Sequence, residues 1–225
     1  ANMSHEFRTP LNAILGYTSL LLQGVSGELG AQQERNLSRV DSNARHLLAI
    51  INDILDISRI EAGKMPLHVS RFPIPALIQE VLAELEPLIQ RSKLSVRVET
   101  ARKLPPISND RAKVKQIVLN LVTNAIKFTP SGLVTVSARH EPSAKEIEIA
   151  VKDTGIGIKS EDYERVFEDF RQADNSPARE YAGAGLGLAI CRRLAHMMEG
   201  HVELQSAVGQ GSTFTLTLPV RLRRR

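Results

Sequence analysis

The chain has 225 residues, of which 42% are hydrophobic and 24% charged, as is usual for a globular protein. Its net charge of +4 is supplied by four arginines at the C-terminal tip, and 4% of its residues are aromatic, which together argue against a nucleic-acid-binding surface. A single cysteine, Cys191, excludes an intrachain disulfide and a cysteine metal cluster, and it is typical of a reducing compartment. No apolar run reaches the roughly 20 residues of a membrane span, so we expect a cytoplasmic location. The abrupt start before His5 indicates a fragment, from which a sensor, coiled-coil or membrane segment upstream is missing.

Two helices are predicted at the start of the chain. The first covers residues 1 to about 23, a glycine-rich turn covers 24–30, and the second helix runs from about 31 to 61. The second helix carries apolar residues at alternating spacings of three and four, which is a heptad pattern: Leu37, Val40, Ala44, Leu47, Ile51 and Ile54, continued by Ser58. Further apolar residues widen this stripe beyond a two-helix seam. We therefore expect an all-α hairpin that pairs through residues 1–62 with a second copy, forming a homodimeric four-helix bundle. The alternative is that the stripe packs against the rest of the same chain.

The periodicity changes after residues 62–66, which contain glycine and proline and are predicted to form a hinge. Strands are expected at 67–70, 94–99, 134–137, 147–151, 202–205 and 213–218, and helices at 74–90, 111–127 and 185–199. This order predicts an α+β two-layer sandwich, with helices over one face of a mixed, largely antiparallel sheet. The predicted domains are therefore residues 1–66 and 67–225.

The first helix contains the sequence Ser-His-Glu-Phe-Arg-Thr-Pro-Leu at residues 4–11. His5 and Thr9 are four residues apart and share a helix face, and Glu6 directly follows the histidine. A neutral imidazole is a competent nucleophile, and a neighbouring carboxylate can hold its second proton. Pro10 cannot donate a hydrogen bond within the helix, so a bend is expected after the histidine. The alternative is an ordinary surface histidine on an amphipathic helix.

The predicted helix at 111–127 has one polar stripe on an otherwise apolar surface, formed by Lys113, Gln116, Asn120, Asn124 and Lys127. Asparagine is a poor residue for a helix interior, so two of them one turn apart suggest a function. Amide oxygens suit Mg²⁺, which also binds substrate phosphates, and a lysine supplies a positive charge for a phosphate. A plain solvated stripe is the alternative.

Two glycine-containing segments follow. Asp153 comes at the end of a predicted strand, where it can accept a hydrogen bond from an exocyclic amine such as that of adenine, and Gly155 and Gly157 allow a close backbone approach to a flat ligand. Residues 183–187 place three glycines before an apolar helix, which suits phosphate binding. The segment between them is polar and turn-forming with phenylalanines at its front, as is typical of a lid. Each of these segments taken alone is also compatible with a simple turn.

The order of these motifs resembles that of the sensor histidine kinases of two-component signalling, over nearly the whole chain. Residues 4–11 match the family's H box, 120–128 its N box, 153–157 its first glycine box, 166–170 its F box, 185–188 its second glycine box and 209–214 its last glycine segment. The resemblance implies a dimerisation and phosphotransfer hairpin followed by an ATP-binding domain of the type shared with gyrase, Hsp90 and MutL.

The resemblance also implies roles for individual residues. His5 would accept the γ-phosphoryl group of ATP, Glu6 would orient it, and Thr9 would position water for dephosphorylation of the partner, a response-regulator receiver domain. Asn124 would hold Mg²⁺, Asp153 would bind the adenine amine, and Arg179 in the lid would reach the γ-phosphate. The full set of implied nucleotide-binding residues is Asn120, Asn124, Lys127, Phe128, Asp153, Gly155, Gly157, Phe170, Arg179, Gly183, Gly185, Leu186, Gly187 and Thr213.

The sequence departs from the family pattern at three positions. Ala182 and Ala184 stand where glycine and threonine are common, which affects the expected lid contacts, and Phe128 replaces a common tyrosine. The predicted function is ATP-dependent autophosphorylation on His5 and transfer to a receiver aspartate. The alternatives are a catalytically inactive ATP-binding scaffold and a gyrase- or Hsp90-type ATPase.

Overall fold

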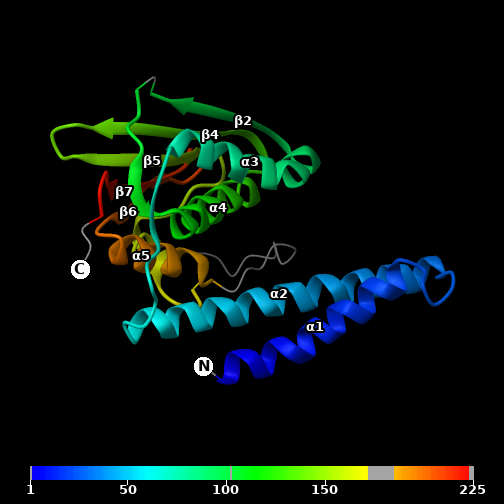
Figure 1. The fold of residues 1–225 in the computed structure, drawn as a ribbon. Coiled ribbons are helices and arrows are strands. Elements are labelled where there is room, and N and C mark those ends of the chain that lie inside the picture. The colour runs from blue at the N-terminus through cyan, green and yellow to red at the C-terminus, as the bar shows by residue number, and fades with distance from the viewer. Residues whose placement is uncertain (1, 102, 172–184, 223–225) are drawn as a thin grey trace. The chain divides into compact units, whose positions relative to one another are not determined.

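The computed structural model describes residues 2–101, 103–171 and 185–222, with side chains from Glu6 onward. The chain divides into two compact units, Ala1–Met65 and Pro66–Arg225. In Figure 1 the first unit is coloured blue to cyan, and the second runs from cyan to red. The units are described separately below.

The first unit is a hairpin of two long helices, α1 (Asn2–Leu22) and α2 (Ala31–Glu61). The capping interaction at the start of α2 is a hydrogen bond from the Gly30 amide to Gln33 Oε1 at 2.8 Å. Two residues after the end of α2, Gly63 turns the chain away from the helix, with a φ of 62° in the left-handed conformation that glycine adopts at little cost. Arg8 Nη2 donates to Asn52 Oδ1 at 3.1 Å, a contact that joins the two helices one turn from the start of the H box motif. These helices confirm the predicted α-hairpin.

The second unit is built on a five-stranded sheet in the order β2-β4-β5-β7-β6. Its strands are β2 (Lys93–Thr100), β4 (Ser131–Glu141), β5 (Glu146–Asp153), β6 (His201–Ala207) and β7 (Gly211–Pro219). β2 pairs with β4 in parallel, whereas the other three pairings are antiparallel. The mixed, largely antiparallel sheet is therefore confirmed.

Three helices, α3 (Ile74–Arg91), α4 (Arg111–Lys127) and α5 (Gly187–Met197), pack on the sheet, and α4 contacts both of its neighbours. Figure 1 shows this helical layer on one side of the strands. The alternating apolar residues of the strands and the apolar face of α4 meet between the layers, and their side chains are fully buried: Ile117, Leu121, Val136, Ile147, Ile149 and Leu216. The short 3₁₀ turns η1 (Ser160–Asp162) and η2 (Arg165–Phe167) precede α5.

A second, two-stranded sheet was not expected from the sequence. β1 (Val69–Phe72) pairs antiparallel with β3 (Ile107–Asp110), and β3 contains a buried asparagine and aspartate that mask its strand character in the sequence. Asp110 then caps α4, because its carboxylate accepts a hydrogen bond from the Lys113 amide at 3.1 Å. The observed β1 begins and ends two residues later than the predicted strand at 67–70. The strands β4 and β5 at the centre of the large sheet are longer than the predicted ranges. Within the described residues, no helix is both long and apolar enough to cross a membrane.

Candidate nucleotide-binding and phosphotransfer sites

One wall of the candidate nucleotide site is the polar stripe of α4. Asn120, Asn124 and Lys127 are all partly buried, and Asn124 Nδ2 donates to Asn120 Oδ1 at 2.9 Å. Among the described residues, Asn124 Oδ1 has no hydrogen-bond partner, so this oxygen is available as a ligand. Burial lowers the pKa of Lys127, and its Nζ lies 4.9 Å from the centre of the Phe128 ring. The stripe thus combines amide oxygens with a partly desolvated cation.

The second wall is the carboxylate of Asp153 at the end of β5. Asp153 is 5% exposed, and its Oδ1 accepts hydrogen bonds from the amides of Gly155 at 2.8 Å and Ser212 at 3.3 Å. Burial raises the pKa of Asp153, while these two hydrogen bonds oppose the rise because they favour the ionised form. Both of these hydrogen bonds go to Oδ1, and within the described residues no hydrogen bond of normal geometry reaches Oδ2, which can accept a donor from a ligand.

Two glycines allow the segments around the site to pack closely, because a side chain at either position would collide with neighbouring atoms. A Cβ on Gly155 would lie 2.2 Å from Phe128 O and 2.9 Å from Asp153 Oδ1. A Cβ on Gly187, the first residue of α5, would lie 2.3 Å from Asn120 Nδ2. The first glycine therefore joins the end of α4 to Asp153, and the second brings the start of α5 against the asparagine stripe.

Two further predicted nucleotide-binding glycines each pack closely against a neighbouring part of the backbone. Gly157, with a φ of 70°, packs against Ala207 O, and Gly185, with a φ of 71°, packs against the backbone of Phe170 and Arg171. Leu186 is fully buried and anchors the start of α5, whereas Phe170 is 64% exposed. Arg179 and Gly183 lie outside the described residues, as do Ala182 and Ala184.

Two residues beside Asp153 were missed by the sequence reasoning. The strand β7 brings the Ser212 amide to the carboxylate, whereas its neighbour Thr213, which the resemblance implies as a nucleotide-binding residue, pairs with Lys152 in the sheet. The Ser212 hydroxyl also lies 2.9 Å from Ser206 Oγ. Thr129 is 2% exposed, and its hydroxyl lowers the pKa of Asp153, although no described hydrogen bond of normal geometry joins them. The period of two along β7 could have separated Ser212 from Thr213, but no sequence signal indicated Thr129.

The F box, residues 166–170, is held by contacts with α5 and β7. Phe167 is buried and meets Phe214 of β7 edge to face, with ring centres 6.3 Å apart. Asp169 accepts two hydrogen bonds from Arg193 of α5, at 2.5 and 2.8 Å, and Arg193 holds the pKa of this carboxyl below its usual range. These contacts fix residues 167–169 against α5 and β7.

The candidate phosphotransfer residues belong to the helical unit. His5 lies in the first two turns of α1, and Glu6 and Thr9 are exposed on the same helix. Pro10 lies inside α1, which continues to Leu22. The described side chains that follow His5 on α1, from Glu6 to Pro10, are all exposed.

Comparisons with known proteins agree with this arrangement. Residues 1–63 match the family described as "His Kinase A (phospho-acceptor) domain", and residues 109–222 match "Histidine kinase-, DNA gyrase B-, and HSP90-like ATPase". The chain is 42% identical over 225 residues to the "Non-motile and phage-resistance protein" of Caulobacter vibrioides, covering 98% of this chain and 27% of that protein. It is 43% identical over 222 residues to "Sensor protein GacS" of Pseudomonas syringae pv. syringae, covering 97% of this chain and 24% of that protein.

Among solved structures, full-length ShkA in complex with AMPPNP has a TM-score of 0.84 and 34% identity, and the match covers 97% of this chain and 45% of that one. The chain spans about a quarter of the length of these curated relatives.

Proposed function

Because this chain belongs to the sensor histidine kinases of two-component signalling, we propose that it phosphorylates His5 with ATP and passes the phosphoryl group to a response regulator. The single observation that carries this proposal is that Gly155 packs both against Phe128 O, next to the α4 stripe of Asn124 and Lys127, and against the Asp153 carboxylate, in the unit that follows a helical hairpin bearing His5. The division into compact units at Met65 and Pro66 supports separate roles for residues 1–66 and 67–225.

In the nucleotide-binding unit, Asp153 would accept a hydrogen bond from the exocyclic amine of adenine through its free carboxylate oxygen. Gly155 keeps the backbone after α4 close to that carboxylate, because a side chain at this position would collide with Phe128 O and with Asp153 Oδ1. Lys127 would attract the phosphates, with a lower desolvation cost on binding because it is already partly buried. The structure of a relative, full-length ShkA, contains the ATP analogue AMPPNP, which supports nucleotide binding by the present chain.

The free Oδ1 of Asn124 and the polar stripe beside it fit a Mg²⁺ ion, which prefers oxygen ligands and usually shares them between the protein, water and nucleotide phosphates. When bound, Mg²⁺ would neutralise part of the phosphate charge that builds up during transfer. Asn120 holds Asn124 in place by accepting its Nδ2 hydrogen bond, and Gly187 fixes the position of Asn120.

In the helical unit, a neutral ring nitrogen of His5 would attack the γ-phosphorus of ATP. A bond between that nitrogen and phosphorus forms, the bond from phosphorus to the β,γ-bridging oxygen breaks, and ADP leaves. Glu6 would hold the proton on the other ring nitrogen and so keep the attacking nitrogen unprotonated. The phosphoryl group would then move to a receiver-domain aspartate, and Thr9 would position water when the same surface removes it again.

We further propose that two copies of the chain pair through the hairpin. Apolar side chains of α1 and α2 remain largely exposed in one copy, including Phe7 at 53%, Tyr17 at 71% and Leu47 at 47%. A surface of this kind on two heptad helices is expected to be covered by a second hairpin.

The proposal is tested by incubating the chain with γ-labelled ATP. Wild-type protein is expected to acquire an acid-labile label, His5→Gln is expected to acquire none, and the control His46→Gln, on α2, is expected to label normally. ATP affinity should be equal in all three proteins, because both histidines lie outside the nucleotide-binding unit. Wild-type protein that binds ATP but never becomes labelled would indicate a scaffold, and steady phosphate release without a labelled chain would indicate an ATPase of the gyrase or Hsp90 type.

A further inference from the structure

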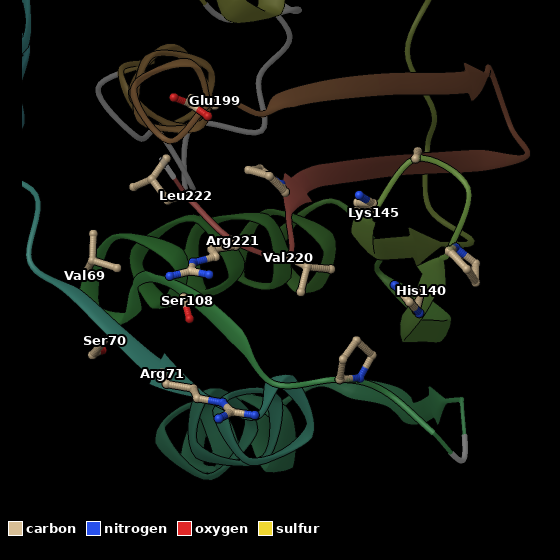
Figure 2. A pocket seen from close by; sticks show the side chains of 14 residues that line it. Val69, Ser70, Arg71, Ser108, His140, Lys145, Glu199, Val220, Arg221 and Leu222 are labelled. Atoms are coloured by element: carbon tan, nitrogen blue, oxygen red, sulfur yellow. The ribbon is translucent and has the colours of Figure 1, made fainter. Parts of the chain in front are cut away.

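A hollow in the α/β unit lies apart from the nucleotide-binding residues. It has a volume of about 1060 Å³, and its walls come from the two-stranded sheet, the turn between β4 and β5, the end of α5 and the segment after β7. Figure 2 shows the residues that line it, which include Arg71, Ser108, His140, Lys145, Glu199 and Arg221. None of the lining residues belongs to the predicted nucleotide site, so the hollow needs an explanation of its own.

Arg71, Ser108 and Arg221 form one row across three adjacent segments of chain. Ser108 of β3 is the register partner of Arg71 on β1, and it also forms an isolated parallel bridge with Arg221. Directly paired residues place their side chains on the same face of a sheet, so both arginines flank the serine hydroxyl on the face that lines the hollow. Since neighbouring strands are about 4.8 Å apart, the backbones of the two arginines are separated by about 10 Å.

The row has a firmly held backbone. The Ser108 amide donates to Val220 O at 2.8 Å, and the Leu222 amide donates to Ser108 O at 2.9 Å. The Val220 amide donates to Lys145 O at 2.9 Å, which ties the turn between β4 and β5 to the same segment. The positions from which these cationic side chains extend are therefore fixed before any partner arrives.

The positive charge at the hollow is not balanced by the surrounding protein. Within the described residues, Arg71, Lys145 and Arg221 form no ion pair or side-chain hydrogen bond, and one carboxylate, Glu199, lines the hollow with them. The nearby Glu141 does not line it and accepts a hydrogen bond from the Ser143 hydroxyl at 2.6 Å. Three cations with one carboxylate leave an excess of positive charge at the hollow, and an anionic partner would relieve the repulsion between the cations.

We propose that this hollow is a docking site for an acidic peptide segment of a protein partner. Guanidinium groups pair with carboxylates through two parallel hydrogen bonds, and the Ser108 hydroxyl adds a donor between the two arginines. The site is too large for one small anion, and its cations come from separate segments, which suits an extended chain bearing several carboxylates. Apolar residues between the charges, including Val69 and Val220, would contact the aliphatic parts of such a chain.

The site is separate from the nucleotide site, and its test does not depend on kinase activity. The probe is a fluorescein-labelled decapeptide of glutamate, titrated with the full chain and followed by fluorescence anisotropy, with a decapeptide of glutamine as the neutral control. Wild-type protein is expected to bind the glutamate peptide, more weakly at about 0.5 M salt than at about 0.1 M because exposed charges are screened. The double variant R71E/R221E should lose at least about tenfold in affinity.

The matched control is Arg97→Glu, which reverses an exposed arginine on the edge strand β2. It should bind the peptide as wild type does, and unchanged ATP affinity in each variant shows that the unit is folded. Should R71E/R221E fail to fold, the neutral variant R71Q/R221Q replaces it, with a smaller loss expected. The proposal is overturned if the wild type does not prefer the glutamate peptide, if Arg97→Glu loses as much affinity, or if the double variant loses binding to anionic phosphatidylserine vesicles but not to the peptide.

Discussion

The helical hairpin and the α/β unit differ in how completely each buries its own apolar side chains. In the α/β unit the core between α4 and the sheet includes residues with no exposed surface, such as Ile117 and Leu121. In the hairpin Leu11 and Ala44 are buried, but Ile14, Leu20, Val40 and Leu47 are each more than 40% exposed. The α/β unit can therefore hold a precise binding site by itself, whereas the hairpin is expected to complete its core with a second copy.

This difference matches the chemistry proposed for each unit. Nucleotide recognition depends on fixed groups at short distances, such as Asp153 with its two amide donors. A phosphoryl acceptor that must meet both a nucleotide-binding unit and a receiver domain needs accessible surroundings, and the α1 residues from Glu6 to Pro10 are exposed.

The first prediction concerns the closed core. Leu121→Ala removes a fully buried side chain between α4 and the sheet, and we expect a loss of about 2–5 kcal/mol in the free energy of unfolding. Urea denaturation should show that the loss is the same at all protein concentrations, because the core lies within one chain. A loss for Leu121→Ala that changes with protein concentration would show that the α/β unit is not self-contained.

The second prediction separates binding from stability at Asp153. Asp153→Asn should weaken ATP binding on the order of 100-fold, because the carboxylate is replaced at the expected adenine contact. Burial raises the pKa of Asp153, so ionisation at neutral pH costs folded-state stability. The variant, whose amide oxygen can still accept the Gly155 hydrogen bond, should therefore melt at the same temperature as wild type or higher. Calorimetric titration and thermal melting give the two quantities, and normal ATP affinity would refute the assignment.

The third prediction concerns the open face of the hairpin. Leu47→Ala should weaken self-association about tenfold, because each copy loses apolar contact area in the expected seam. Ser42→Ala, at an exposed outward position on the same helix, is the control and should associate as wild type does. Sedimentation equilibrium measures both, and equal dissociation constants for the three proteins would mean that Leu47 faces solvent in the assembly.

The smallest effect is expected from an ion-pair network between α3 and α4. Hydrogen bonds from Lys115 and Arg111 lower the pKa of Glu80 to about 2, from a usual value of 4.5. This pKa shift stabilises the folded state above pH 4.5. As the pH falls from 4.5 towards 2, the stabilisation is lost, because Glu80 becomes protonated in the unfolded state while the folded state still holds it ionised. In Glu80→Gln, stability should change less across this window than in wild type, as measured by denaturation at each pH. Identical pH profiles would show that the network does not contribute.

Much of the fold was predictable because the two periodicities are distinct. The heptad spacing from Leu37 to Ile54 indicated a helix, and the alternation at 147–151 indicated a strand. The strand β3 was missed because it contains two buried polar residues, Asn109 and Asp110, whose burial depends on tertiary partners. One such partner is the His68 amide, which donates to Asp110 Oδ2 at 2.7 Å. Contacts between residues 42 positions apart leave no local pattern in the sequence.

The candidate site was predictable where a motif combined unusual residue types with fixed spacing. Asn120 and Asn124 stand one helical turn apart in an apolar helix, and the structure joins them by a hydrogen bond. Ser212 and Thr129 were missed because a hydroxyl residue near a loop is common, and only the folded backbone brings them to Asp153. The charged row of Arg71, Ser108 and Arg221 likewise arises from strand pairing between distant parts of the chain.

The central claim is that ATP is bound by one unit and that its γ-phosphoryl group is accepted by the other. The most direct test mixes an isolated fragment of residues 66–225 with the 225-residue Asp153→Asn chain and γ-labelled ATP. The fragment supplies an intact nucleotide site but has no His5, and the variant supplies His5 but binds ATP poorly. We predict an acid-labile label on His5 of the Asp153→Asn chain that depends on the fragment. A fragment that binds ATP with wild-type affinity but never labels the variant, even in excess, would contradict it.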